Sequence, residues 1–406
     1  MNRATRLALL LLLAPAAASA AMPLAIQAGV LYPVSGPPVR DALILIRDGR
    51  ITFVGPAADR MFSADHQVIS AAVVTPGLID GRATVGLSGL LNQPHDQDML
   101  ERSAPVQPEL RAIDAYNGGD PLVAWVRSLG VTTVNTGHSP GALVSGQTMV
   151  VKTSGGARDR EVLQPAAFIT AALGGAGVNR AEGKAPGTRA KAVALLRSEL
   201  IKAQEYVRKR ALTDETKRPA RDLRLEALGR ALDGSQRLLI TVHKAPDILA
   251  ALRLAKEFNL QIVLDGCADA PLVLEEIRAA GFPVIIHPTM ARAGDDTENL
   301  AMDTAAKLAA AGIPFALQSG YESYVPKTRV VLFEAAVAAG RGLGLERALA
   351  SVTLDAARIL GVADRIGTVE VGKDADLALF DGDPFEYTTR VTATVINGEL
   401  FRDGPR

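Results

Sequence analysis

The chain has 406 residues, of which 48% are hydrophobic and 22% are charged, and the Lys+Arg and Asp+Glu counts are both 44. This length accommodates one large α/β unit with a smaller satellite domain, or two or three compact domains. The balanced charge, with no basic run that carries interleaved aromatic residues, argues against nucleic acid and anionic membrane surfaces as partners. A single cysteine, Cys267, excludes an intramolecular disulfide and a zinc site built from several cysteines.

Residues 1–20 have the pattern of an export signal. Arg3 and Arg6 give a positive start, residues 7–13 form an apolar core, and Ala18-Ser19-Ala20 is a small-residue cleavage site. No later stretch approaches the ~20 uninterrupted apolar residues that a membrane span requires. We therefore expect an exported protein, periplasmic or secreted, with no membrane association after the signal is cleaved.

Residues 21–74 have the pattern of short strands separated by turns. The hydrophobic runs 26–32, 42–47 and 51–54 are bounded by turn-forming residues. Asp48-Gly49 lies between the second and third runs and indicates a hairpin, because both residues tolerate a positive φ. A small β-domain is predicted here.

Between residues 75 and 362, buried strands alternate with helices, which is typical of a parallel α/β barrel. The helix expected over 189–210 carries apolar residues three and four apart, and the next clear helix covers 246–258. The segment 142–151 is expected to be extended. The buried strands predicted for this barrel are 130–135, 238–242, 260–264, 282–286 and 313–317.

Residues 363–406 return to short apolar segments separated by turns. Gly372-Lys373-Asp374 and Asn397-Gly398 are the turn sequences of this region. Neither end of the chain alone offers enough strands to bury a sheet face, so we expect residues 21–74 and 363–406 to share one β-domain.

Two stretches resemble the metal-dependent amidohydrolase superfamily. Val73-Val74 followed by Pro76-Gly77-Leu78-Ile79-Asp80 is similar to the first barrel strand of that family, and residues 365–377 are similar to the segment that returns to its β-sandwich. The resemblance implies a TIM-like (β/α)8 barrel with a small composite β-sandwich from both chain ends. The implied domains are a signal peptide (1–20), an N-terminal β-sandwich segment (21–74), the barrel (75–362) and a C-terminal β-sandwich segment (363–406).

Further motifs resemble the imidazolonepropionase-related branch of the superfamily. They are Ala172-Leu173-Gly174, the segment 184–189 and the segment 242–255. The resemblance implies a zinc site built from a His-x-His pair, a carboxylated lysine or acidic bridge, a histidine on each of two neighbouring strands and a final aspartate. In such a site the metal lowers the pKa of bound water and the carboxylate takes its proton.

Most of those ligands are missing from this sequence. A guanidinium cannot donate a lone pair to a cation, and a zinc ion held by one imidazole is not a stable site. We therefore expect no bound zinc and no other cofactor. The family's ligand positions carry over onto Arg82, Thr84, Thr170, His243, Gly266 and Gly320, of which only His243 can bind metal.

The other histidines offer no replacement metal site by spacing. His95 lies in a polar loop after the first barrel strand, where a binding role and a solvated loop are equally good interpretations, and His138 has the same standing. His287 is interpreted as a capped strand end, and His66 belongs to the β-domain. No His-x-His or His-Glu-x-x-His spacing occurs.

The Gly137-His138-Ser139-Pro140-Gly141 stretch matches a nucleophile elbow in its letters only. That elbow uses the N–H after the serine as an oxyanion donor, and Pro140 has none. We interpret this stretch as a strand-end turn, which leaves the catalytic residues unknown.

A pocket is expected at the C-terminal ends of the barrel strands, because barrel sites are built there. Its candidate residues are Arg82, His95, His138, His243 and Asp265. The permanent charge of Arg82 repels a divalent cation and attracts a carboxylate, so the expected small-molecule ligand is anionic.

Two functions follow. The first is a degenerate amidohydrolase, a pseudoenzyme that serves as a binding or partner subunit beside an active paralogue or in a homo-oligomer. The alternative is an active hydrolase of C–N bonds, in cyclic amides or dipeptide-like compounds, with a rearranged site. The missing ligands favour the first, and the family resemblance favours the second.

Overall fold

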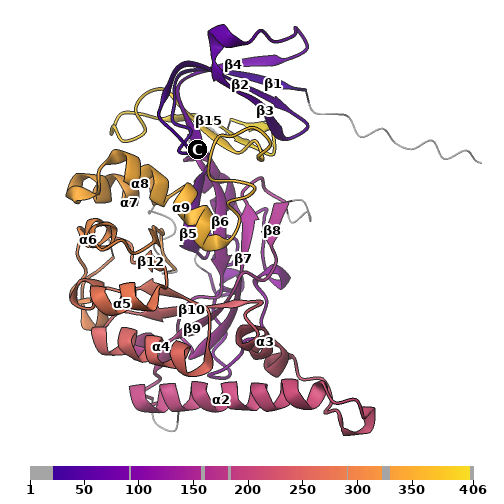
Figure 1. Cartoon of the computed structure of the whole chain (residues 1–406), viewed down its shortest axis with the longest axis vertical. Helices are drawn as coiled ribbons and strands as arrows, with labels where there is room; N and C mark the ends of the chain where they lie inside the picture. Colours follow the sequence, from indigo (N-terminus) through magenta and orange to yellow (C-terminus); the bar gives the residue numbers. More distant parts are fainter. Residues whose placement is uncertain are drawn as a thin grey trace, which may run out of the picture.

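The computed structural model describes residues 22–90, 93–156, 161–181, 184–289, 291–321 and 330–402. The predicted signal peptide, residues 1–20, lies outside this range. Within it the chain forms a barrel and a smaller β-domain at one end of the molecule (Figure 1).

The β-domain is one seven-stranded sheet built from both ends of the chain. Its strands are β1 (Leu24–Leu31), β2 (Val39–Arg47), β3 (Arg50–Pro56), β4 (Gln67–Pro76), β14 (Leu377–Phe380), β15 (Val391–Ile396) and β16 (Glu399–Phe401). In the order β16-β15-β14-β4-β1-β2-β3, the C-terminal strand β14 pairs antiparallel with β4. Buried Ile26, Val74 and Leu377 share one apolar core. The prediction of a composite β-domain is confirmed.

The barrel is a curved sheet in the order β13-β12-β11-β10-β9-β7-β6-β5, with β8 (Val162–Gln164) paired to β7 outside this path. Its strands are β5 (Leu78–Ala83), β6 (Val131–Gly137), β7 (Val144–Lys152), β9 (Phe168–Ala172), β10 (Arg237–Val242), β11 (Ile262–Gly266), β12 (Val284–Ile286) and β13 (Phe315–Ala316). The hydrogen bond from Gly81 N to Leu317 O, 3.1 Å long, brings the first strand against the segment after the last. A Cβ atom on Gly81 would lie 2.6 Å from that carbonyl oxygen, so the seam requires glycine here.

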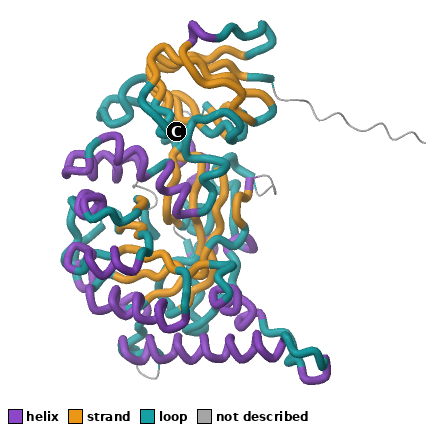
Figure 2. Tube along the Cα trace, in the orientation of Figure 1, coloured by secondary structure: helices purple, strands orange, loops and turns teal. Residues whose placement is uncertain are grey.

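Helices that lie between the barrel strands in sequence pack around the outside of the barrel (Figure 2). They are α1 (Pro121–Ser128), α2 (Arg189–Arg210), α3 (Leu223–Leu232), α4 (Ala245–Phe258), α5 (Leu274–Ala280), α6 (Thr304–Ala310), α7 (Val331–Ala338), α8 (Leu345–Ser351) and α9 (Leu354–Leu360). The Thr188 hydroxyl caps α2 by accepting from Lys191 N, which fixes the start of the helix where the sequence predicts it. The TIM-like barrel predicted from the sequence is confirmed.

One barrel strand departs from the predicted parallel pattern. β7 runs antiparallel to both of its neighbours, β6 and β9. Only the short turn at residues 138–143 separates β6 from β7, and a parallel return requires a crossover of a dozen residues or more. The segment expected to be extended is therefore a central strand of the barrel.

Among the residues that the structure describes, no helix combines the length and apolar composition required to cross a bilayer.

Candidate functional site

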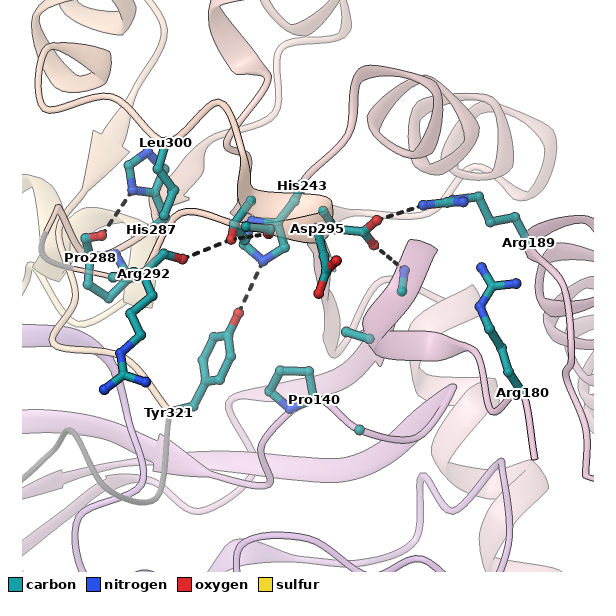
Figure 3. Close-up of a pocket in the computed structure, with 17 residues that line it drawn as sticks. Pro140, Arg180, Arg189, His243, His287, Pro288, Arg292, Asp295, Leu300 and Tyr321 are labelled. Carbon is teal, nitrogen blue, oxygen red and sulfur yellow. Dashed lines mark hydrogen bonds and ion pairs between the residues drawn. The ribbon is translucent and has the colours of Figure 1, made fainter.

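A pocket of about 740 Å³ lies at the C-terminal ends of the barrel strands (Figure 3). Its walls come from loops that follow different strands: Pro140 after β6, His243 after β10, His287 after β12 and Tyr321 after β13. Because these strands end at the same rim, residues far apart in sequence converge there. The predicted location of the pocket agrees with this geometry.

The rim on one side is organised by Arg189, the first residue of α2. Its Nε donates to Asp247 Oδ2 at 3.0 Å and its Nη2 donates to Asp296 Oδ1 at 2.7 Å. Asp296 also accepts a hydrogen bond from Gly175 N. These links join the starts of two helices to the loop after β12, so that side of the pocket is held by charge-assisted hydrogen bonds.

Two further arginines, Arg180 and Arg292, line the pocket. Arg180 and Arg292 are exposed, and neither guanidinium contacts a carboxylate among the described residues. In Figure 3, Arg180 stands near Arg189 while Arg292 lies on the opposite side of His243. With Asp295 as the remaining acidic residue at the rim, the mouth of the pocket is suited to attract an anionic molecule.

His243 occupies the middle of the pocket, with the Tyr321 side chain directed at it (Figure 3). Tyr321 Oη and His243 Nε2 are 3.5 Å apart, and the buried His243 Nδ1 has no hydrogen-bond partner among the described residues. Burial lowers the pKa of His243, and the carboxylate of Asp265 opposes that shift. Burial also lowers the pKa of His287, to about 4, so both imidazoles are neutral at pH 7.

Arg82 lies beneath this floor with its side chain fully buried. Its Nη2 donates to the backbone carbonyl of His138, and its Cζ is 6.0 Å from the centre of the Tyr321 ring. Burial lowers the pKa of Arg82, although the carboxylates of Asp265 and Asp80 raise it, and an arginine remains charged at neutral pH. The barrel therefore holds a permanent positive charge in its interior.

Two buried carboxylates lie near Arg82, and other groups use their oxygens. Asp80 accepts from Arg82 N at 3.2 Å and from Ser319 N at 3.0 Å, and also from the Ser319 hydroxyl. Asp265 accepts from the Thr241 hydroxyl at 2.6 Å and from Gln318 Nε2 at 2.7 Å. Burial raises the pKa of Asp80 to about 6 despite these hydrogen bonds.

These side chains do not fit the family's zinc. Arg82 presents only donors, while Gly266 and Gly320 have no side chain. Thr170 uses its hydroxyl on Ser145 Oγ, at 2.8 Å, and on a backbone carbonyl, at 3.0 Å. Across the described portion of the chain, no group of three or more His, Cys, Asp or Glu side chains is placed to hold a metal ion.

Gly266 shows why the missing histidine has no room. Its φ is +87°, in the left-handed region that favours glycine, and an added Cβ would lie 2.5 Å from His243 Cε1. His243 therefore fills the space that a side chain at position 266 would need.

The structure brings together some predicted site residues and leaves others out. His243 lines the pocket, while Arg82, His138 and Asp265 are buried below its walls. His95 does not line it: its side chain is exposed in the turn Pro94–Asp96, and Gln97, the next residue, pairs with Ser88 in the loop after β5. Of the five predicted pocket candidates, His243 alone is among the residues that line this pocket. A loop at a strand end can fold back over the rim instead of into it.

Several pocket residues were missed. His287 was interpreted as a strand cap, and it does contact Pro288 O at 3.1 Å, yet it also lines the pocket. Tyr321, Arg180 and Arg292 lie in loops that carry no local motif. The one sequence signal that these residues share is their position in a loop after a predicted strand or before a predicted helix. Many other loop residues have such a position, so it could not identify these residues as part of the pocket.

Comparisons with known proteins agree with this architecture. Residues 325–401 match the model of the Amidohydrolase family. The amidohydrolase tasK of Hapsidospora irregularis is 26% identical over 401 residues, which cover 89% of this chain but only 40% of that protein. The imidazolonepropionase of Rhizobium rhizogenes is 24% identical, over 90% of this chain and 92% of its own.

A solved amidohydrolase from Thermotoga maritima MSB8 has a similar structure, with a TM-score of 0.87 and 26% identity over 93% of this chain and all of its own. Because the match covers 93% of this chain, it includes both the barrel and the β-domain. On its sequence and its fold, the chain belongs to the amidohydrolase superfamily and is related to the imidazolonepropionases.

Proposed function

We propose that this protein is an exported, non-catalytic amidohydrolase relative that binds a small molecule in the pocket around His243. The observation that carries the proposal is the buried guanidinium of Arg82 at the position where the family resemblance places the first zinc-binding imidazole. A fixed positive charge at that point repels a divalent cation and leaves water without the metal that would activate it. The electropositive mouth, with Arg180 and Arg292, supports a binding role for anionic molecules.

The test is the metal content and activity of protein purified without chelators. We expect much less than one zinc per chain and no metal-dependent turnover of cyclic amides or dipeptides. About one tightly held zinc per chain, lost in the His243→Ala variant, would overturn the proposal. The His95→Ala variant is the matched control, because His95 is exposed outside the pocket.

A second candidate is a metal-independent hydrolase of C–N bonds. It is favoured by the neutral imidazoles of His243 and His287 in one pocket, since perturbed pKa values in a cleft are typical of catalytic sites. Turnover that survives chelators but is lost in His243→Ala would select this candidate over the binding protein. Turnover that is unchanged in His243→Ala would exclude it.

Export and association with another subunit belong to the same proposal. Export is supported by residues 1–20 of the sequence, and its test is fractionation of cells that express the chain with and without those residues. A partner, either an active paralogue or a second copy, is supported only by the absence of the expected zinc ligands. Light scattering of the purified protein, alone and with a paralogue, tests it.

A further inference from the structure

The guanidinium of Arg82 is buried with most of its hydrogen bonds unmade. Its side chain has no exposed surface, and within the described part of the chain it makes one hydrogen bond, from Nη2 to the His138 carbonyl. Both Nε and Nη1 lack a partner. Because an arginine has five N–H donors, four of them have no acceptor among the described residues.

The charge of Arg82 is also unbalanced by direct contact. Asp80 and Asp265 are near enough to influence it electrostatically, but their oxygens accept hydrogen bonds from other groups. Asp80 accepts from Ser319 and from the backbone N–H of Arg82, and Asp265 accepts from Thr241 and Gln318. No carboxylate among the described residues forms an ion pair with its guanidinium. A buried charge that has lost its hydration and has no ion-pair partner is strongly unfavourable, which points to an absent anion.

The unused donors have the arrangement that a carboxylate requires. A guanidinium presents two bidentate edges, one formed by Nε and Nη2 and the other by Nη1 and Nη2. Nη2 carries two hydrogens, and the His138 carbonyl takes one of them. Whichever hydrogen is used, both hydrogens of one complete edge stay unpaired, and two parallel hydrogen bonds to a carboxylate would satisfy them.

Other polar atoms inside the barrel are also unsatisfied among the described residues. Both ring nitrogens of His138, Nδ1 of His243 and Oε1 of Gln318 are buried without a hydrogen-bond partner. Barrel interiors are normally filled by branched apolar side chains, so polar atoms left unpaired at one end mark a site for a polar occupant.

Tyr321 connects Arg82 with the pocket. Its ring lies 6.0 Å from Arg82 Cζ, and the same residue lines the pocket beside His243. On the other side, Pro140 and Gly141 line the pocket two and three residues after the carbonyl that Arg82 binds. The guanidinium is therefore one side chain below the pocket floor.

We infer that the ligand carries a carboxylate that binds the unpaired edge of the Arg82 guanidinium, while its remaining atoms occupy the pocket between Tyr321, His243 and Arg292. The ligand class is a small carboxylic acid, of a size that a cavity of about 740 Å³ holds. This inference rests on the proposed binding function and specifies what is bound. Arg180 and Arg292 attract the anion to the mouth, and Arg82 fixes its position.

The experiment uses a matched pair of probes, hippurate and its neutral amide, titrated into the purified protein by calorimetry. Both probes have the same size and aromatic ring, and only hippurate has a carboxylate. We expect hippurate to bind more than about tenfold tighter than the amide, since a bidentate charge-assisted pair exceeds a factor of ten in affinity. Arg82→Met should remove that preference.

Two further variants separate charge, geometry and folding. Arg82→Lys keeps a buried cation but loses the two parallel N–H groups of the guanidinium. Hippurate should therefore bind this variant, but more weakly than it binds wild type. Arg180→Gln removes a mouth arginine of the same charge and should change the affinity by less than about threefold, mostly through the association rate. A melting curve of each variant shows whether it is folded.

Two results with wild type would overturn the inference: equal affinity for hippurate and the amide, or no hippurate binding at concentrations up to about 10 mM. Two results with variants would also overturn it. These are unchanged hippurate affinity in Arg82→Met, and an affinity of Arg82→Lys for hippurate equal to that of wild type. If the amide binds wild type and variants alike, the pocket is a binding site and only the carboxylate assignment fails. If the protein holds zinc and turns over substrate, the proposed function fails instead, whatever hippurate does.

Discussion

Asp80 on β5 and Ser319 after β13 are joined by two hydrogen bonds across the seam of the barrel. The backbone N–H of Ser319 donates to Asp80 Oδ1 at 3.0 Å, and the Ser319 hydroxyl donates to Oδ2. Together with the backbone contact from Gly81 to Leu317, this pair closes the barrel directly beside Arg82. A carboxylate buried at a structural seam makes the stability of the barrel depend on pH.

The Asp80→Asn variant tests this dependence. Burial raises the pKa of Asp80 from 3.8 to about 6, so between these values the folded protein binds more protons than the unfolded chain. Stability from this group is therefore present below pH 3.8 and is lost as pH rises to 6, by about 3 kcal/mol. Asparagine cannot ionise, and its amide can donate to the Ser319 hydroxyl while its oxygen accepts from the backbone.

Urea unfolding of wild type and Asp80→Asn at several pH values measures the effect. The free energy of unfolding of the variant should rise relative to wild type between pH 4 and 6 and be constant above. Asp59→Asn, at an exposed position in the turn Ala57–Asp59, is the control. A difference between wild type and Asp80→Asn that does not change with pH would show that Asp80 titrates normally.

His138 should produce the opposite dependence on pH. Burial lowers its pKa from 6.5 to about 4, and the positive charge of Arg82 adds to that shift. Between pH 6.5 and 4 the unfolded chain binds more protons, so stability is present above pH 6.5 and falls by about 3 kcal/mol as pH drops to 4. The His138→Gln variant should lose less stability on acidification than wild type.

The matched control for His138 is His95→Gln, since His95 is exposed and lies outside the pocket. Acid titrations of unfolding, followed by circular dichroism, compare the three proteins over the same pH range. If His138→Gln and His95→Gln lose equal stability between pH 6.5 and 4, the low pKa of His138 is wrong.

The sequence predicted the fold well where local chemistry determines structure. The Asp48-Gly49 turn has positive φ at both residues and joins β2 to β3, and α2 covers the predicted residues 189–210. Binary patterning and turn residues specify such elements without reference to the rest of the chain. The orientation of β7 was not predictable in the same way, since it depends on which strands flank it.

The site was predicted less completely because it depends on convergence. Arg82 and His243 were identified by their positions in a family pattern, but the contact of Tyr321 with both comes from a loop 78 residues after His243. Lys152, the last residue of β7, was not among the predicted site residues, and it is fully buried. Because lysine is seldom buried, a lysine in a sequence is expected to be exposed. The burial of Lys152 becomes evident only from its partners in the folded structure.

Gly266 offers a test of how tightly His243 is held. An added Cβ would meet His243 Cε1 at 2.5 Å at a φ of +87°, so Gly266→Ala should cost about 2–4 kcal/mol and displace the imidazole. Gly281→Ala is the control, because Gly281 has a φ of +75° and no atom within 4 Å of the added Cβ. It should show the backbone strain alone, about 1 kcal/mol.

Thermal and urea unfolding give the two stability losses, and a ¹H–¹⁵N spectrum of the imidazoles reports the position of His243. A larger loss in Gly281→Ala than in Gly266→Ala would contradict the steric assignment. An unchanged His243 signal in Gly266→Ala would show that the ring has room to spare.

Lys152 and Arg82 are two fully buried cations with different surroundings, and they should respond differently to the same substitution. Lys152 Nζ contacts Asp374 at 2.7 Å and Asp376 at 2.8 Å, which links β7 of the barrel to the β-domain. Lys152→Met leaves the buried Asp376 without a cation, so we expect a loss of about 3–5 kcal/mol. Arg82→Met strands no ion-pair partner among the described residues and removes an unbalanced buried charge, so the ligand-free variant should be at least as stable as wild type.

Urea unfolding of both variants, with Lys152→Met/Asp376→Asn completing a double-mutant cycle, measures the contrast between Lys152 and Arg82. The added Asp376→Asn should restore some of the stability lost in Lys152→Met, because it removes the stranded charge. Equal losses for Lys152→Met and Arg82→Met would mean that Arg82 is already balanced in the ligand-free protein, and the case for an absent anion would fall with it.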